Sequence, residues 1–155
     1  MSDKGNILVK HNAEDSGVCL YAHWSGSELP ADLQEALAKQ WRWGDTSYLT
    51  RIIFDVMTEG QHGGERSFGI SSKVFEGEWR VLEVNCEKQT ITYNGKSWSF
   101  EQYIALSPIE IEAIWNIPQL TSLALDGGDS AARQAESAPE VGTGHEADTT
   151  PPAAQ

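Results

Sequence analysis

The sequence is poor in cysteine, in positive charge and in long hydrophobic runs. Two cysteines in 155 residues are too few for a structural zinc site, and Cys19 and Cys86 both lie in apolar strand patterns that favour buried thiols over a disulfide. No apolar run approaches the roughly 20 residues of a membrane span, and no apolar segment of a signal peptide follows the first residues. We therefore expect a cytoplasmic protein without membrane contact.

The shortage of positive charge bears on the partners of the protein. Eleven lysines and arginines stand against 23 acidic residues, which gives a formal net charge of -12. Such a charge disfavours direct binding to nucleic acid, because phosphates are repelled, and it favours solubility or a basic partner. Residues 125–155 add to the acidity and contain no aromatic residue, so they cannot bury enough apolar surface to fold. We expect one domain over residues 1–124 and a disordered acidic tail over 125–155.

Hydrophobic periodicity predicts the first half of the domain. Residues 7–10 and 18–24 read as two strands joined by a turn-rich segment. Pro30 suits the first turn of a helix, and Leu33, Leu37 and Trp41 recur at i, i+4 and i+8, so we expect a helix that Gly44 ends. A second helix should follow, capped by Asp45 or Thr46, with a broad apolar face between residues 48 and 57.

Strand and turn signals dominate the second half. Residues 67–71 and 78–85 read as strands, and Asn94-Gly95 predicts a hairpin between residues 90–93 and 96–98. Ser99 and Ser107 begin capping-box patterns of short helices. Two strands, two helices, about four strands and then short helices predict an α+β fold, with an antiparallel sheet of about five to six strands, two main helices packed on one face and short C-terminal helices.

Polar groups with chemical potential gather after the second strand. His23 is a candidate general base or ligand group, because an imidazole titrates near neutral pH; it is equally a packed histidine satisfied by Ser25, Ser27 or backbone. The Gly26 loop is typical of a weak anion site at a helix start, although Glu28 already supplies negative charge there. No catalytic partner lies at a diagnostic spacing, so we assign no catalytic residue, and His23 is the one candidate.

Other candidates are aromatic or cationic. Arg66, in a glycine-rich connection, has the chemistry to bind a phosphate or carboxylate, or serves only as part of the connector. Of the six tryptophans, Trp41 fits the apolar stripe, whereas Trp43 and Trp98 are expected to be partly exposed. We expect no metal site and no cofactor. The candidate ligand- or partner-binding residues are His23, Trp24, Ser25, Ser27, Trp43, Arg51 and Arg66.

Separated sequence blocks carry a resemblance. In order, they are Tyr21-x-His23-Trp24-x-Gly26-x-x-Leu29-Pro30, then Trp43-x-Asp45-x-x-Tyr48-Leu49-x-Arg51-Ile52-Ile53-Phe54, then Phe68-Gly69-Ile70-Ser71. Over roughly residues 18–95 the chain resembles a group of small, uncharacterised bacteriophage and prophage proteins. The resemblance implies a phage or mobile-element setting, and it implies no activity.

A compact acidic domain without a catalytic signature and with many aromatics fits a protein that binds and blocks a target. We therefore expect a non-enzymatic phage accessory protein, a host-takeover or counter-defence inhibitor, whose partner is a basic, nucleic-acid-binding host protein in the host cytosol. Three alternatives stay open: sequestration of a small nucleotide-like ligand, a small hydrolase or transferase that uses His23 as base, and a structural protein of a virion.

Overall fold

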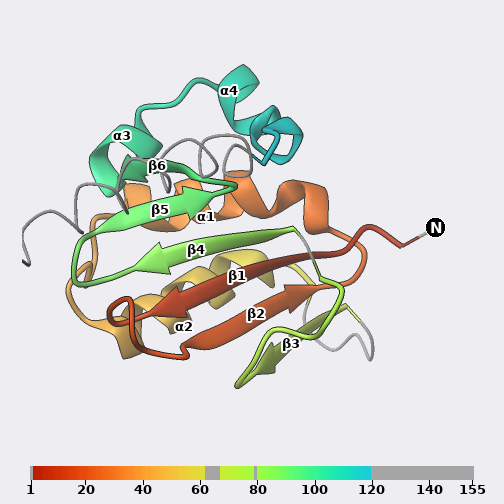
Figure 1. Ribbon diagram of the computed structural model, residues 1–155, viewed down its shortest axis with the longest axis horizontal. Helices are drawn as coiled ribbons and strands as arrows, with labels where there is room; N and C mark the ends of the chain where they lie inside the picture. Colours follow the sequence, from red (N-terminus) through yellow and green to blue (C-terminus); the bar gives the residue numbers. More distant parts are fainter. Residues whose placement is uncertain (1, 62–66, 79, 120–155) are drawn as a thin grey trace, which may run out of the picture. The chain divides into compact units, whose positions relative to one another are not determined.

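A six-stranded sheet forms the centre of the fold (Figure 1). A computed structural model of the chain describes residues 2–61, 67–78 and 80–119, and the expected tail over 125–155 and Arg66 lie outside these ranges. The strands are β1 (Gly5–Lys10), β2 (Val18–Ala22), β3 (Phe68–Ser71), β4 (Val81–Asn85), β5 (Thr90–Tyr93) and β6 (Lys96–Ser99), in the spatial order β3-β2-β1-β4-β5-β6.

The sheet is mixed, while the predicted α+β class is confirmed. Four of the strand pairings are antiparallel, but β1 and β4 run parallel, with Ile7 beside Leu82 and Val9 beside Val84. This corrects the expectation of a purely antiparallel sheet. Short connections join the antiparallel pairs β1–β2, β4–β5 and β5–β6, whereas β3 reaches β2 only after two helices and β4 reaches β1 only after two helices and β3, so no short turn determines the direction of β3 or β4.

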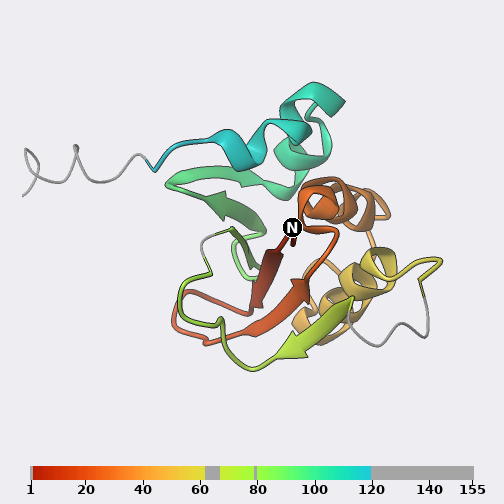
Figure 2. The same ribbon diagram turned by 90° about the vertical axis from the view of Figure 1, so that its right-hand side faces the viewer.

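Helices α1 (Leu29–Ala38) and α2 (Thr46–Met57) cover one face of the sheet, as expected (Figure 2). Pro30 lies in the first turn of α1, and the Asp45 side chain caps α2 by accepting a hydrogen bond from the Tyr48 amide. The buried side chains of both helices pack on the strands in one core, which includes Leu33, Leu37, Leu49, Ile53, Ile7, Val9, Leu20, Leu82, Val84 and Ile91.

Two short helices follow the last strand, α3 (Phe100–Ile104) and α4 (Pro108–Glu112). Both begin with the predicted capping boxes, at Ser99 and at Ser107. The Gln34 side chain of α1 donates hydrogen bonds to three backbone carbonyls between residues 103 and 106, which fixes the α3–α4 connection against α1. Short 3-10 turns at Gly26–Glu28 and Ile114–Asn116 complete the described elements.

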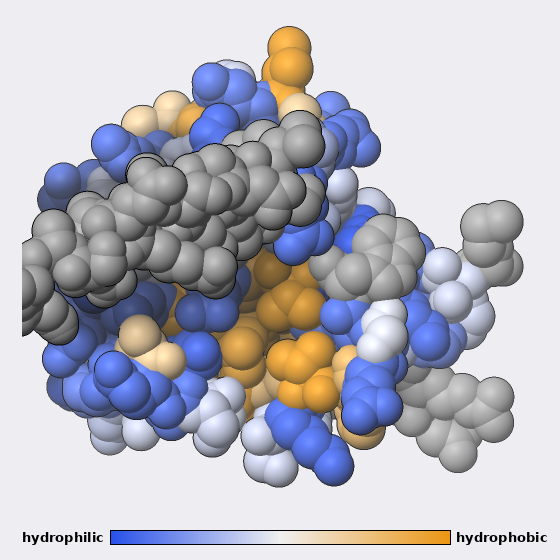
Figure 3. Space-filling view, viewed as in Figure 1, coloured by the Kyte–Doolittle hydropathy of each residue, from blue (hydrophilic) through white to orange (hydrophobic). Residues whose placement is uncertain are grey.

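The sheet face opposite α1 and α2 is partly apolar (Figure 3). Strand alternation places Leu8, Cys19, Tyr21 and Val81 on this side, and the connection from β3 to β4 runs along it (Figures 1 and 2). Cys19 and the neighbouring Asn6 are fully buried. Within the described residues, no helix is long and apolar enough to cross a bilayer.

Candidate functional site

The imidazole of His23, just beyond β2, already has neighbours inside the domain. The Tyr21 hydroxyl lies 2.9 Å from the Nδ1 atom, and the Trp24 ring packs edge-on at 4.4 Å between centroids. The backbone of His23 is hydrogen-bonded as well, since its amide donates to the Ser67 carbonyl and its carbonyl accepts from the Asp3 amide. The structure therefore pairs His23 with a tyrosine, while Trp24 beside it is 53% exposed.

Of the two serines of this segment, Ser27 binds Asp3 and not the histidine pair. Ser27 donates to Asp3 Oδ2 from its hydroxyl at 2.6 Å and from its amide at 2.9 Å. Partial burial alone would raise the pKa of Asp3, but these hydrogen bonds and the Arg80 guanidinium hold it below its usual range. Among the described contacts, no hydrogen bond joins His23 to Ser25 or Ser27, so the arrangement expected of a hydrolase is not assembled here.

The Gly26 loop also uses its amides internally. The Gly26 amide donates to the Asp3 carbonyl at 2.8 Å, and the Glu28 amide donates to Ser25 at 3.0 Å. A Cβ atom on Gly26 would lie 2.4 Å from the carbonyl carbon of Lys4, so the loop is pressed directly against the start of β1. The amides of Gly26, Ser27 and Glu28 are therefore already used within the domain and are not available to an anion.

Helix α1 ends earlier than the sequence suggested, and this changes where the tryptophans lie. The helix stops at Ala38, and Gln40 then takes a left-handed conformation with φ of 58°, so the predicted stop at Gly44 is wrong. Trp41 thereby leaves the apolar stripe and is 58% exposed, whereas the interior was expected for it. Trp98, which was expected to be partly exposed, is buried at 7% because it faces the core from β6.

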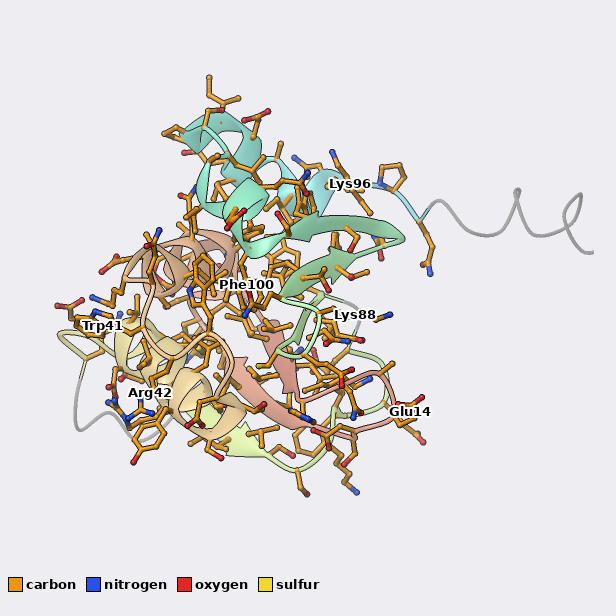
Figure 4. The ribbon with its side chains drawn as sticks, turned by 90° about the vertical axis from the view of Figure 1, so that its left-hand side faces the viewer. Glu14, Trp41, Arg42, Lys88, Lys96 and Phe100 are labelled. Carbon is orange, nitrogen blue, oxygen red and sulfur yellow. The ribbon has the colours of Figure 1, made fainter. Side chains whose placement is uncertain are left out.

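Trp43 is half-buried and structural. Its indole nitrogen donates to the Leu37 carbonyl at 3.0 Å, and its ring packs edge-on against Phe100 at 5.3 Å. Figure 4 shows Phe100 in the interior, and Trp41 and Arg42 at the outer corner beside α2. A single residue, Arg42, separates Trp41 from Trp43, yet one ring faces solvent and the other the core.

Trp41 forms the wall of a groove along the outer face of α2. Two adjoining hollows, of about 310 and 440 Å3, share Trp41, Arg51 and Ile52, so they form one continuous depression. We call it the α2 groove; its lining residues are Lys39, Trp41, Arg42, Tyr48, Arg51, Ile52, Asp55, Val56 and Glu59. Of these, the sequence analysis had identified only Arg51 as a binding candidate.

The floor of the α2 groove is apolar and its rims are aromatic and charged. Ile52 and Val56 lie at the bottom, exposed by 4% and 8%, while Tyr48 on the rim is 49% exposed. Residues 48, 52 and 56 lie one helical turn apart, so this stripe extends for about 12 Å along α2. An apolar side chain of a partner would contact this floor between two exposed aromatic rings.

Cations rest on both exposed rings. The Lys39 ammonium lies 5.3 Å from the centroid of Trp41, and the Arg42 guanidinium lies 4.6 Å from that of Tyr48. Arg51 pairs with Asp55 one turn further along α2, at i, i+4 spacing. These contacts hold the rings in place and leave much of each exposed, which suits a rigid binding surface.

The backbone of the turn that carries Trp41 is unusual. Gln40 and Arg42, on either side of Trp41, both take left-handed φ values, of 58° and 56°. Neither residue is glycine, and each such conformation costs about 1 kcal/mol or more. This turn directly follows α1 and carries Trp41, which is 58% exposed.

A row of three acidic residues along α1 contains one carboxyl group, that of Asp32, with a raised pKa. Glu28, Asp32 and Glu35 recur at i, i+4 and i+7 on the helix. Partial burial, with Glu28 and Glu35 alongside, raises the pKa of the Asp32 carboxyl from 3.8 to about 7. Within the described ranges, no group of three or more histidine, cysteine or acidic side chains is arranged to hold a metal ion.

Comparisons with known proteins found no match for this chain. No family model, no curated protein and no solved structure matches the chain. The α2 groove is therefore identified by its geometry alone.

Proposed function

We propose that the chain is a non-enzymatic binding protein that contacts a partner protein through the α2 groove. The observation that carries the proposal is Trp41, a large aromatic side chain that is 58% exposed above an apolar floor and lies between two left-handed non-glycine residues. Tryptophan, tyrosine and arginine are the residues that most often dominate binding energy at protein interfaces, and all three line this groove.

The sequence supports a setting and a partner for this proposal. The net charge of -12 favours a basic partner, and the resemblance to phage and prophage proteins favours a bacterial one. In this proposal the protein is a phage accessory factor in the host cytosol, a host-takeover or counter-defence inhibitor that occupies a basic, nucleic-acid-binding host protein. The internally satisfied hydrogen bonds around His23 and Ser27 support binding over catalysis.

A capture experiment with matched tryptophan variants tests this function. The tagged full-length chain is incubated with bacterial lysate at about 0.05 M and about 0.5 M salt. We expect the wild type and Trp24→Ala to capture the same protein at low salt and Trp41→Ala to lose it. Trp24 is a suitable control because it is nearly as exposed, at 53%, and lies outside the groove.

Three results would contradict the proposal. Capture that survives Trp41→Ala but fails with Trp24→Ala would place binding at the other end of α1. A nucleotide-sized mass bound to the purified chain would favour ligand sequestration, with the exposed rings as stacking surfaces. Substrate turnover that disappears in His23→Ala, without a change in melting temperature, would make the protein an enzyme.

A further inference from the structure

The two edge strands of the sheet, β3 and β6, differ in how well they are protected against pairing with a further strand (Figure 1). At the end of β6 the Ser99 amide donates to the Gln102 side chain at 2.8 Å, and Lys96 places a charge on this strand, as protected edges often do. In contrast, β3 contains no charged residue, and its Ile70 side chain is 62% exposed. The edge at β3 is therefore the one that is open to another strand.

The register of β3 on β2 shows which backbone groups point away from the sheet. The His23 amide donates to the Ser67 carbonyl, and these two residues continue the β2–β3 register. Because hydrogen-bonded and non-hydrogen-bonded pairs alternate in an antiparallel ladder, Gly69 bonds to β2, whereas Phe68 and Ile70 direct their N–H and C=O groups outward. No hydrogen bond within the described residues uses the amide of Phe68 or Ile70. This edge thus presents two donors and two acceptors with the spacing of a β-strand.

The sequence of this edge has the same chemical pattern in both directions. It reads Ser67-Phe68-Gly69-Ile70-Ser71, with a serine at each end, an apolar residue next to each serine and a glycine at the centre. A two-fold axis at Gly69 would pair this segment with itself, apolar beside apolar and serine beside serine. We propose that a second copy of this chain pairs with β3, so that the two β3 strands form an antiparallel ladder that joins the two sheets.

The outward groups of the two strands meet in this register. Phe68 of one copy lies opposite Ile70 of the other, and each such pair exchanges two backbone hydrogen bonds. Both side chains lie on the sheet face that α1 and α2 cover, because their partners on β2 are the core residues Ala22 and Leu20. An aromatic ring beside a β-branched side chain is a favourable cross-strand pair.

Glycine at the axis suits the closest point of this contact. The two copies of Gly69 face each other as a non-hydrogen-bonded pair, for which the Cα atoms approach to about 4.5 Å. No atom lies within 4 Å of the Cβ position of Gly69, so the space that the second copy enters is open on this side of the strand. The same open space allows a side chain to be introduced there as a test without disturbing the fold.

The expected interface is closed and weak. Since the β6 edge is protected, pairing ends at two copies and does not continue into a filament. One strand from each copy buries much less than the roughly 1,600 Å2 of a standard interface, and the net charge of -12 on each copy opposes association. We expect a dissociation constant on the order of 100 µM. The contact itself is uncharged, so added salt should screen the repulsion and strengthen the dimer.

This dimer goes beyond the proposed function and uses no residue of the α2 groove. The two are distinguishable by salt, because capture of a basic partner should weaken as salt is added, whereas pairing through β3 should strengthen. A chain that dimerises but captures nothing from a lysate leaves the dimer standing without the proposed function. A chain that captures a protein through Trp41 but stays monomeric at about 1 mM leaves the proposed function standing without the dimer.

Sedimentation velocity of the full-length chain measures the dimer, from about 10 µM to about 1 mM protein and at about 0.15 M and 0.5 M salt. We expect the wild type to shift from monomer to dimer over this range, at lower protein concentration in the higher salt. Gly69→Glu and Gly69→Lys should each remain monomeric, because each places like charges directly opposite one another at the axis. Gly44→Glu is the matched control: Gly44 is exposed with equal free space around its Cβ position, so this variant should dimerise like the wild type.

Mixing the two monomeric variants gives the most specific result. In an equimolar mixture of Gly69→Glu and Gly69→Lys, opposite charges face each other across the axis, so a dimer should reappear. Circular dichroism checks that each variant is folded before mixing. A wild type that is monomeric at about 1 mM, or a mixture that stays monomeric while both variants are folded, would overturn the proposal.

Amide hydrogen exchange, followed by NMR, tests whether the dimer forms at this edge. The amides of Phe68 and Ile70 should exchange quickly in the dilute wild type and become protected at about 1 mM. The Gly69 amide serves as the internal reference, because it bonds to β2 in both states and its protection should change much less. A dimer that leaves the Phe68 and Ile70 amides as exposed as in the monomer would also overturn the proposal.

Discussion

The two ends of helix α1 use similar residues in opposite ways. Before the helix, Ser27 and Gly26 direct their donors inward to Asp3, and Tyr21 lies against His23. After the helix, Trp41 and the neighbouring Arg42 project into solvent from a strained turn. Polar or aromatic side chains indicate a binding site only where their interactions have not been used to hold the fold together. We therefore propose the C-terminal end of α1, where Trp41 is 58% exposed beside the α2 groove, as the binding end.

The largest expected effect comes from Gly26, which fixes the structural end. In Gly26→Ala the new Cβ would lie 2.4 to 2.6 Å from backbone atoms of Lys4 and Gly5, which cannot move without disturbing β1. We expect a loss of about 3 kcal/mol in the free energy of unfolding, measured by urea denaturation. Gly44→Ala is the matched control: no atom lies within 4 Å of its Cβ position, so its stability should change little. Equal stability of the two variants would show that this loop is loosely packed.

Alanine variants of Trp43 and Trp41 compare a packed and an exposed tryptophan within one turn. Trp43→Ala removes a ring packed on Phe100 and a hydrogen bond to Leu37, so we expect it to lower the free energy of unfolding by about 2 kcal/mol. Trp41→Ala removes an exposed ring and should change stability by less than about 0.5 kcal/mol. Chemical denaturation of both variants measures the difference. A Trp41→Ala variant as unstable as Trp43→Ala would give Trp41 a structural role.

Asp3 connects the loop before α1 to β4. Its carboxylate accepts from Ser27 and pairs with Arg80, whose side chain is 19% exposed. Asp3→Asn removes the charge from both contacts, and we expect a loss of about 1 to 2 kcal/mol at pH 7. Because the pKa of Asp3 is lowered by folding, the difference from wild type should fade as the pH drops through and below about 4. Glu14→Gln, on an exposed turn, is the control that should leave stability unchanged.

Asp32 gives the smallest expected effect, with the opposite pH dependence. Folding raises the pKa of its carboxyl from 3.8 to about 7, so the folded state binds the proton more tightly than the unfolded state does. Ionisation therefore opposes folding, and the wild type should lose stability as the pH rises from about 4 to about 7. Since the group is partly solvated, we expect Asp32→Asn to stabilise the protein by only about 1 kcal/mol at pH 8. A variant that is no more stable than wild type at pH 8 would contradict this.

Local signals in the sequence predicted most of the elements. Pro30 and Asp45 mark the starts of α1 and α2, Asn94-Gly95 forms the turn between β5 and β6, and Ser99 caps α3. Each of these features depends on interactions between residues a few positions apart. The parallel pairing of β1 with β4 depends on contacts between residues about 75 positions apart, so no local pattern reveals it.

The candidate site was harder to predict than the fold. The i, i+4, i+8 spacing that placed Trp41 in the core assumes that the helix continues to that residue, and it stops at Ala38. Gln40 provides the left-handed position that a glycine usually provides at a helix end, so the sequence carries no visible stop signal there. Arg51 was named as a binding candidate from the sequence, but the groove around it depends on the path of the turn that carries Trp41.

Site-specific photo-crosslinking tests most directly which end of α1 binds. A benzophenone amino acid is introduced at Tyr48, on the rim of the α2 groove, or at Trp24, at the opposite end of α1, and each full-length chain is irradiated in bacterial lysate. We expect covalent adducts with a bacterial protein from position 48 and none from position 24. Adducts that form from position 24 and not from position 48 would contradict it.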